Sequence, residues 1–222
     1  MNRASLNRLT LPMLPRFAGD TLFDRIARAV CRAGCLPRKE LYEAWEVARR
    51  VRRRYRGGRV VDLACGHGLL AHILLILDDS SPEALAVDPR IPENAGRLAE
   101  SLHAGWPRLV NRVRFQAASL DAVDIRPDDL VVSAHACGNL TDRVIDRAVE
   151  AGARLAVLPC CHNLARCDTG GLTGWIDGPL AVDVTRAARL REAGYTVVTQ
   201  KIPGDITPKN RLLMGHCGAM KR

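Results

Sequence analysis

Apolar side chains near the amino end of the chain recur at helical spacing. One such stripe covers about residues 21–36, and a second covers residues 38–55. Pro37 separates the two predicted helices, because a proline ring does not fit inside a helix. Residues 1–19 lack this periodicity, so we expect them to form an arm. The sequence thus predicts an N-terminal arm and helical extension over residues 1–56.

From residue 59 onward, apolar runs of strand length alternate with helical stretches. The predicted strands cover about residues 60–63, 84–88, 113–118, 130–134, 155–158, 195–202 and 212–216. Helices are expected between most of them, over about residues 69–77, 93–104, 141–151 and 180–193. Strands joined through helices pair in parallel, in a sheet covered on both faces, whereas a short loop lets the last two strands pair as a hairpin. We therefore expect one α/β domain over residues 57–222.

The first predicted strand leads into a glycine-containing turn with the sequence VVDLACGHG, and an apolar helix follows. Glycine accepts left-handed backbone angles and leaves room for a ligand. The free N–H groups at the start of the helix attract an anionic or polar group above the turn. The pattern predicts a nucleotide or nucleoside cradle, to which we assign Asp62, Ala64, Cys65, Gly66 and Gly68.

Asp88 ends the second predicted strand and can accept two hydrogen bonds from ribose hydroxyls. NAD and S-adenosylmethionine (SAM) both carry such a ribose, and a G-x-G-x-x-A run ending at Ala71 matches the dinucleotide fingerprint. A carboxylate at Asp62 repels a pyrophosphate but suits the cationic amino-acid end of SAM. The D-x-A-x-G-x-G pattern resembles motif I of class I SAM-dependent methyltransferases, with Ala64 where that family usually has its first glycine. We expect SAM as cofactor and keep an NAD-dependent oxidoreductase as the alternative.

Polar residues also follow the later strands, at the edge where ligands of open α/β sheets bind. After the third strand, Ser119 or Asp121 is the nearest candidate for the adenine amino group, and we choose Ser119. Ser133 ends the fourth strand and is assigned to the cofactor as well.

Two segments with unusual composition follow the fourth and fifth strands, SAHACGNLTD at residues 133–142 and PCCHN at residues 159–163. Their pairing resembles a family of SAM-dependent methyltransferases, which includes methyltransferase-like proteins with HxCG and CCxH-type segments. More distantly, it is similar to tRNA 2′-O-methyltransferases. The resemblance covers residues 59–217, including TPKNR at residues 207–211. It implies a Rossmann-like class I methyltransferase fold, mostly parallel with a closing hairpin, and SAM as cofactor.

Methyl transfer requires an aligned acceptor and, for a hydroxyl or a protonated nitrogen, removal of a proton. His135 and His162 are the candidate bases, because imidazole titrates near neutral pH, and each can equally be structural. Lys209 can lower the pKa of an acceptor or bind a phosphate, and Asn210 can orient the acceptor. Contact with the substrate is assigned to Cys137, Cys160 and Cys161.

These three cysteines and His162 also form a donor set that zinc favours. However, neighbouring residues at a strand end point to opposite sides, so Cys160 and Cys161 are not expected to reach one ion. We therefore expect no obligate metal.

The positive charge of the chain suggests an anionic partner. The 222-residue chain is 47% hydrophobic, as a folded domain should be, and has a formal net charge of +9. Seven arginines fall within residues 49–59, and we expect Arg52 and Arg53 to contact phosphates beside the cofactor pocket. RNA, either tRNA or rRNA, is the expected acceptor. The alternatives are a solvated arginine face, an acceptor that is a protein or a small molecule, and a non-catalytic RNA-binding module.

The remaining composition points to a cytoplasmic location. No apolar run approaches the roughly 20 residues that span a bilayer, so no membrane association is expected. The first 20 residues carry no signal-peptide pattern. The eight cysteines lie mainly in apolar runs, which favours reduced thiols.

Overall fold

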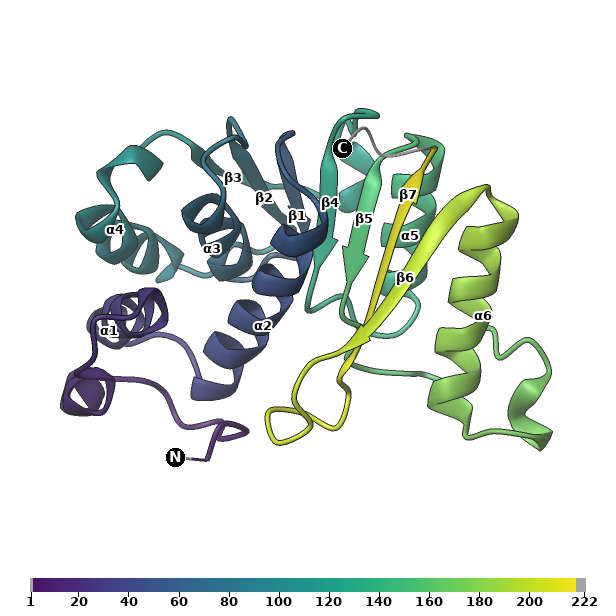
Figure 1. The fold of residues 1–222 in the computed structure, drawn as a ribbon, viewed down its shortest axis with the longest axis horizontal. Coiled ribbons are helices and arrows are strands. Elements are labelled where there is room, and N and C mark those ends of the chain that lie inside the picture. The colour runs from purple at the N-terminus through teal and green to yellow at the C-terminus, as the bar shows by residue number, and fades with distance from the viewer. Residues whose placement is uncertain (1, 219–222) are drawn as a thin grey trace.

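The computed structural model describes residues 2–218; Met1 and residues 219–222, at the end of the predicted domain, lie outside the described residues. Seven strands form one sheet in the order β3-β2-β1-β4-β5-β7-β6. The strands are β1 (Val60–Leu63), β2 (Ala84–Asp88), β3 (Val113–Ala117), β4 (Leu130–Ser133), β5 (Arg154–Val157), β6 (Tyr195–Lys201) and β7 (Arg211–Cys217). The first five are parallel, and β7 lies antiparallel between β5 and β6 (Figure 1). The predicted parallel sheet with a closing hairpin is confirmed.

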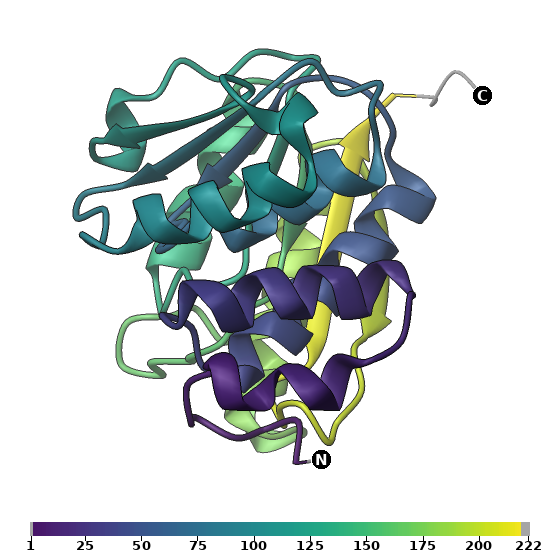
Figure 2. The ribbon, with the colours of Figure 1, turned by 90° about the vertical axis from the view of Figure 1, so that its left-hand side faces the viewer.

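Helices cover both faces of the sheet. One face carries α1 (Leu22–Ala33), α2 (Arg38–Arg54), α3 (Leu69–Leu77) and α4 (Ala95–Gly105), and the other carries α5 (Leu140–Glu150) and α6 (Gly178–Glu192). Helix α2 packs on α3, and α1 lies alongside α4 (Figure 2). Short 3₁₀ helices include η1 (Leu11–Phe17), η3 (Leu120–Ala122) and η4 (Leu172–Gly174).

The alternation of strand residues builds two apolar cores. Val60 and Val132 face the α2–α3 side, and Val61 and Val131 face the α5 side. The helix boundaries follow local chemistry. Thr21 accepts a hydrogen bond from the Asp24 N–H at the start of α1, and Gly34 ends that helix in a left-handed conformation.

The N-terminal segment shares the first of these cores. Leu9 is fully buried, and its N–H donates to the Leu36 carbonyl at 2.9 Å. Phe17 at the end of η1 is buried as well, so the segment expected as an arm instead packs on the helices. Tyr55 is 1% exposed in the same core as Val60, so residues on both sides of the expected boundary at 56/57 pack together. Among the described residues, no helix is both long and apolar enough to cross a bilayer.

Candidate functional site

The turn between β1 and α3 has the backbone of a ligand cradle. Ala64, Gly66 and Gly68 have φ angles of 56°, 53° and 71°, all in the left-handed region. A Cβ at Gly68 would come within 2.8 Å of Phe115, so packing requires glycine there. A Cβ at Gly66 would meet no atom within 4 Å. Gly66 therefore borders open space in which a ligand can approach the backbone.

Two carboxylates flank this turn. Asp62 is 1% exposed, and one of its oxygens accepts the Ala71 N–H at 3.2 Å. Asp88 accepts the N–H groups of Gly66 at 3.2 Å and Arg90 at 2.9 Å. Burial raises the pKa of Asp62 to about 7 against the effect of the Ala71 hydrogen bond, and the nearby Asp88 raises it further. Within the described residues, the Asp62 carboxylate has no cation that offsets its burial.

Hollows lie on both sides of the turn, at the carboxyl ends of the strands. The larger, about 210 Å³, is lined by Asp62, Cys65, Gly66, His67, Ala134, His135 and the start of α2 with Glu40 and Ala44. The smaller, about 80 Å³, is lined by Ala64, Val87, Ala118, Ser119, Leu140 and neighbours. Predicted cofactor residues thus line both hollows. The edge of the sheet where β1, β2, β4 and β5 end is called the carboxyl edge below.

Ser133 offers an unused polar group at this edge. Its Oγ is buried and has no hydrogen-bond partner in the described part of the chain. Ser133 lies on the same face of β4 as Val131, the face that packs with Ala64 and Leu140. A buried hydroxyl without a partner costs about 1–3 kcal/mol, so a ligand that reached it would recover this cost.

The two candidate bases lie in different surroundings. His135 follows β4, is exposed and lines the larger hollow. The His162 side chain is 3% exposed, and its Nε2 lies 2.8 Å from an oxygen of Asp183 in α6. Arg211 bonds the other oxygen at 2.6 Å. Although burial opposes it, hydrogen bonds from His162 and Arg211 hold the pKa of Asp183 below its usual range. His162 therefore holds its loop to α6, whereas His135 is exposed at the wall of the larger hollow.

Lys209 and Asn210, the two predicted site residues before β7, also differ in their contacts. Asn210 exchanges backbone and side-chain hydrogen bonds with Ile202, each at 2.9 Å, and so closes the loop between β6 and β7. Lys209 is exposed, and its Nζ lies 3.7 Å from Cys161 Sγ. Of the two, Lys209 is the one at the candidate site.

The three cysteines converge. Cys137 Sγ and Cys160 Sγ are 3.0 Å apart, and the sulfurs of Cys137, Cys160 and Cys161 all lie within 4.8 Å of one another. The prediction that Cys160 and Cys161 point to opposite sides is wrong, because β5 ends at Val157 and both lie on the following loop. Hydrogen bonds from Cys137 and Cys160 lower the pKa of Cys161, with help from Lys209, although burial opposes them.

The arginine-rich end of α2 lies at the opposite edge of the sheet. A short link joins α2 to the start of β1, so this end approaches the amino edge, where the parallel strands begin (Figure 1). Arg52 is 2% exposed and donates to Leu74 O at 3.1 Å and Ser81 Oγ at 2.8 Å. Its prediction as a phosphate contact is wrong, because it is a buried partner of Asp78 at 3.1 Å. Arg53 is exposed, but it lies on the same last turn of α2, away from both hollows.

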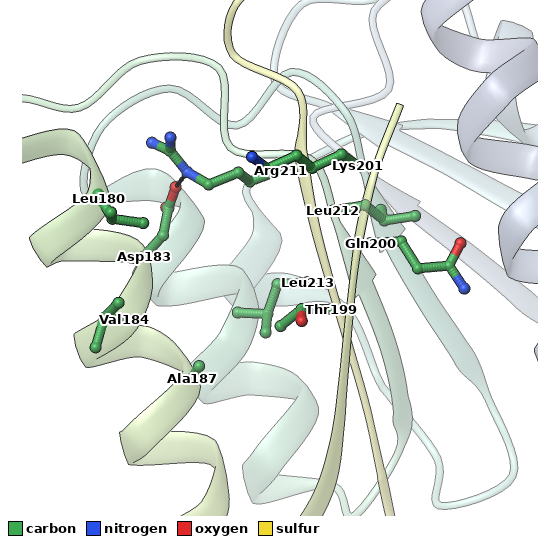
Figure 3. A pocket seen from close by; sticks show the side chains of 10 residues that line it. All are labelled: Leu180, Asp183, Val184, Ala187, Thr199, Gln200, Lys201, Arg211, Leu212 and Leu213. Carbon is green, nitrogen blue, oxygen red and sulfur yellow. Dashed lines mark hydrogen bonds and ion pairs between the residues drawn. The ribbon is translucent and has the colours of Figure 1, made fainter. Parts of the chain in front are cut away.

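Another hollow, of about 380 Å³, lies between α6 and the β6–β7 hairpin (Figure 3). Its walls are mainly apolar, with Leu180, Val184 and Leu213 among them. No residue of the glycine turn lines it. Asp183 in its wall bonds His162, on the loop after β5, at 2.8 Å.

Sequence reasoning missed Glu40. It enters the wall of the larger hollow because α2 packs beside α3, a long-range contact that no local pattern carries.

Comparisons with known proteins agree with this geometry. A family model described as "Methyltransferase domain" matches residues 39–168. A glutathione S-transferase C-terminal domain-containing protein of Xenopus laevis is 30% identical in an alignment of 145 residues that covers 62% of this chain and 20% of that protein. The chain thus spans about a fifth of the length of this curated relative.

Solved structures share the fold. An O-methyltransferase family protein from Burkholderia thailandensis is 22% identical, with a TM-score of 0.55 over 94% of this chain and 64% of the other. The magnesium protoporphyrin IX methyltransferase from Synechocystis, solved with bound SAH, is 16% identical, with a TM-score of 0.53 over 93% and 94% of the two chains. The fold is therefore the Rossmann-like fold of class I methyltransferases.

Proposed function

This chain belongs to the methyltransferase domain family, and from that premise we propose that it transfers a methyl group from SAM to an acceptor at the carboxyl edge. The observation that carries the proposal is the placement of Asp62 and Asp88 around an open glycine turn, with a hollow on either side. An elongated cofactor with a cationic end, a ribose and a flat base suits such a site. The family match disfavours the NAD alternative.

Different residues bind the ribose, the adenine and the amino-acid end of the cofactor. Asp88 accepts the ribose hydroxyls at the tip of β2, and Ser119 lines the smaller hollow for the adenine. Asp62 and Glu40 place carboxylates at the larger hollow, where the ammonium of the amino-acid end belongs. Gly66 gives the ligand access to the backbone. When bound, SAM supplies an electrophilic methyl group.

His135 takes the proton from the acceptor. It is exposed, it lines the larger hollow, and it stands at the end of β4 beside the expected position of the methyl group. Lys209 and the thiols of Cys137 and Cys161 lie together on loops at the same carboxyl edge, and they contact the acceptor. His162 and Asn210 support the loops that carry these groups.

RNA remains the proposed acceptor on two grounds. One is the net charge of +9, and the other is the resemblance of the HACG and PCCH segments to tRNA methyltransferases. The arginine-rich end of α2 no longer supports it, because Arg52 is buried and Arg53 lies at the amino edge. A protein or small-molecule acceptor is therefore the second candidate.

The test uses methyl-labelled SAM and an extract from a strain that lacks this gene. Labelling that ribonuclease removes and protease leaves supports an RNA acceptor, whereas the reverse identifies a protein. Label only in the low-molecular-mass fraction identifies a small molecule. Asp88→Asn serves as the matched control and should abolish labelling. Calorimetry that detects no binding of SAM or SAH would contradict the cofactor assignment itself.

A further inference from the structure

We propose that Cys137, Cys160 and Cys161 together bind one zinc ion through their sulfurs. Two of these residues lie on the loop after β5 and one on the loop after β4, so the cluster joins neighbouring strands at the carboxyl edge. Thiolate sulfur is a preferred ligand of zinc.

The spacing of the sulfurs fits such an ion. With Zn–S bonds of about 2.3 Å, a tetrahedral centre places its sulfurs roughly 3.8 Å apart. The pair Cys137–Cys160 is at 3.0 Å, and every pair is within 4.8 Å. The observed separations therefore lie around the value that a tetrahedral centre requires.

The backbone around the cluster is held in place by other contacts. The Gly138 N–H donates to the Cys161 carbonyl at 2.9 Å, which ties the two loops together. Arg186, 1% exposed, donates to the Gly138 carbonyl at 2.9 Å and to both oxygens of Asp142 at 2.8 Å. A donor set fixed by such supporting bonds loses less entropy when it binds a metal.

Charge and coordination number are also consistent. Three thiolates around a divalent cation leave one negative charge, and Lys209 Nζ lies 3.7 Å from Cys161 Sγ to offset it. His162, which would complete a closed four-ligand set, is instead bonded to Asp183 at 2.8 Å. Cys137 and Cys161 are exposed, so the fourth position is open to solvent. Three protein ligands and one open position are typical of zinc sites that act in catalysis.

The test uses the full chain, reduced and stripped of metal with a chelator. Cobalt(II) alone is then titrated as a spectroscopic substitute. We expect one equivalent to bind, with sulfur-to-cobalt charge transfer and the intense visible bands of a tetrahedral centre, and zinc to displace it. Cys137→Ser, Cys160→Ser and Cys161→Ser should each weaken cobalt binding at least about tenfold, because a hydroxyl is a poorer ligand for this ion.

Cys217→Ser is the matched control, since Cys217 is an exposed free thiol on β7 outside the cluster, and it should bind cobalt like the wild type. Circular dichroism checks that each variant is folded. The proposal is overturned if cobalt binds without thiolate charge transfer, or if folded Cys137→Ser binds it unchanged. The proposal would also be overturned if the isolated protein contained a Cys137–Cys160 disulfide and bound no zinc after that disulfide had been reduced. Because no methyl transfer is measured, the result is independent of the proposed function.

Discussion

The two edges of the sheet differ in whether their buried polar groups have partners within the protein. At the amino edge, Arg59 bonds both oxygens of the buried Asp129, at 3.0 and 2.6 Å. Arg52 is likewise enclosed by Asp78, Ser81 and a backbone carbonyl. Buried charges at this edge have partners with good geometry, which is what keeps them from destabilising the fold.

The carboxyl edge contains groups that the described chain does not satisfy. Asp62 is buried without a cation, Ala64 holds a left-handed conformation, and Ser133 has an unpaired hydroxyl. Each feature costs free energy in the protein alone. All three lie beside the open glycine turn, where a bound ligand could offset their cost. We therefore propose that the ligand binds at the unsatisfied groups of the carboxyl edge, whereas the paired charges of the amino edge support the fold.

The largest effect is expected for His135→Ala at the carboxyl edge. Loss of a general base slows methyl transfer by about 10²–10⁴-fold, or roughly 3–5 kcal/mol. The side chain is exposed, so the free energy of unfolding should not change, and SAH should still bind because His135 is assigned to the acceptor and Asp62, Asp88 and Ser119 to the cofactor. Initial rates with labelled SAM and calorimetry with SAH measure the two quantities. A rate within threefold of wild type would remove His135 from the mechanism.

Arg52→Ala tests the amino edge. Removing one partner of a buried ion pair leaves Asp78 uncompensated and should lower the free energy of unfolding by about 3 kcal/mol. SAH affinity of the folded protein should stay the same. The matched control is Arg53→Ala, an exposed neighbour that should change stability by less than about 0.5 kcal/mol. Equal urea midpoints for the two variants would contradict the structural role of Arg52.

Asp62→Asn should stabilise the free protein while weakening its binding of SAH. The folded pKa of Asp62 is raised from 3.8 to about 7, so the protonated form is the one the fold favours. The contribution of Asp62 to the free energy of unfolding is fully present below pH 3.8 and is lost as the pH rises through the folded pKa of about 7. The asparagine variant should therefore gain about 2 kcal/mol at about pH 8 and little near pH 4; this is roughly half of what the full pKa shift corresponds to, because the asparagine amide is itself a buried polar group. Urea unfolding at both pH values measures this, and a gain that does not depend on pH would exclude the titration of Asp62 as its cause.

The smallest effect concerns Ala64. A left-handed residue with a Cβ is strained by roughly 1–2 kcal/mol, part of which glycine gives back through its entropy in the unfolded chain. Ala64→Gly should raise the free energy of unfolding by about 0.5–1 kcal/mol. Ala151→Gly is the control, because Ala151 has a φ of −83° and should gain nothing. Thermal unfolding of both variants measures the two changes in stability. A loss of stability in Ala64→Gly would show that the backbone at residue 64 is not strained.

Much of the fold could be predicted from local patterns. The bounds of β1 and β2 match the prediction at both ends, because continuous apolar runs and a glycine turn identify buried parallel strands. The N-terminal segment was missed because the apolar residues between Leu9 and Phe17 follow neither helical nor strand spacing, and their burial depends on distant helices.

The same limit applies to the site. Asp62, Gly66 and Asp88 follow from strand ends and turn chemistry, which are local. The position of Arg52 depends on the direction in which α2 packs, and the convergence of Cys160 and Cys161 depends on where β5 ends. The clustering of arginines within residues 49–59 led to a prediction at the wrong edge, because a run of charges carries no information on which side of a fold it lies.

Hydrogen exchange with and without SAH tests the comparison of the two edges most directly. SAH should slow exchange in the glycine turn at residues 64–71 and beyond the ends of β2, β3 and β4, and should leave exchange at residues 49–59 unchanged. Protection confined to residues 49–59 would contradict it, because the cofactor would then bind at the edge assigned to structure.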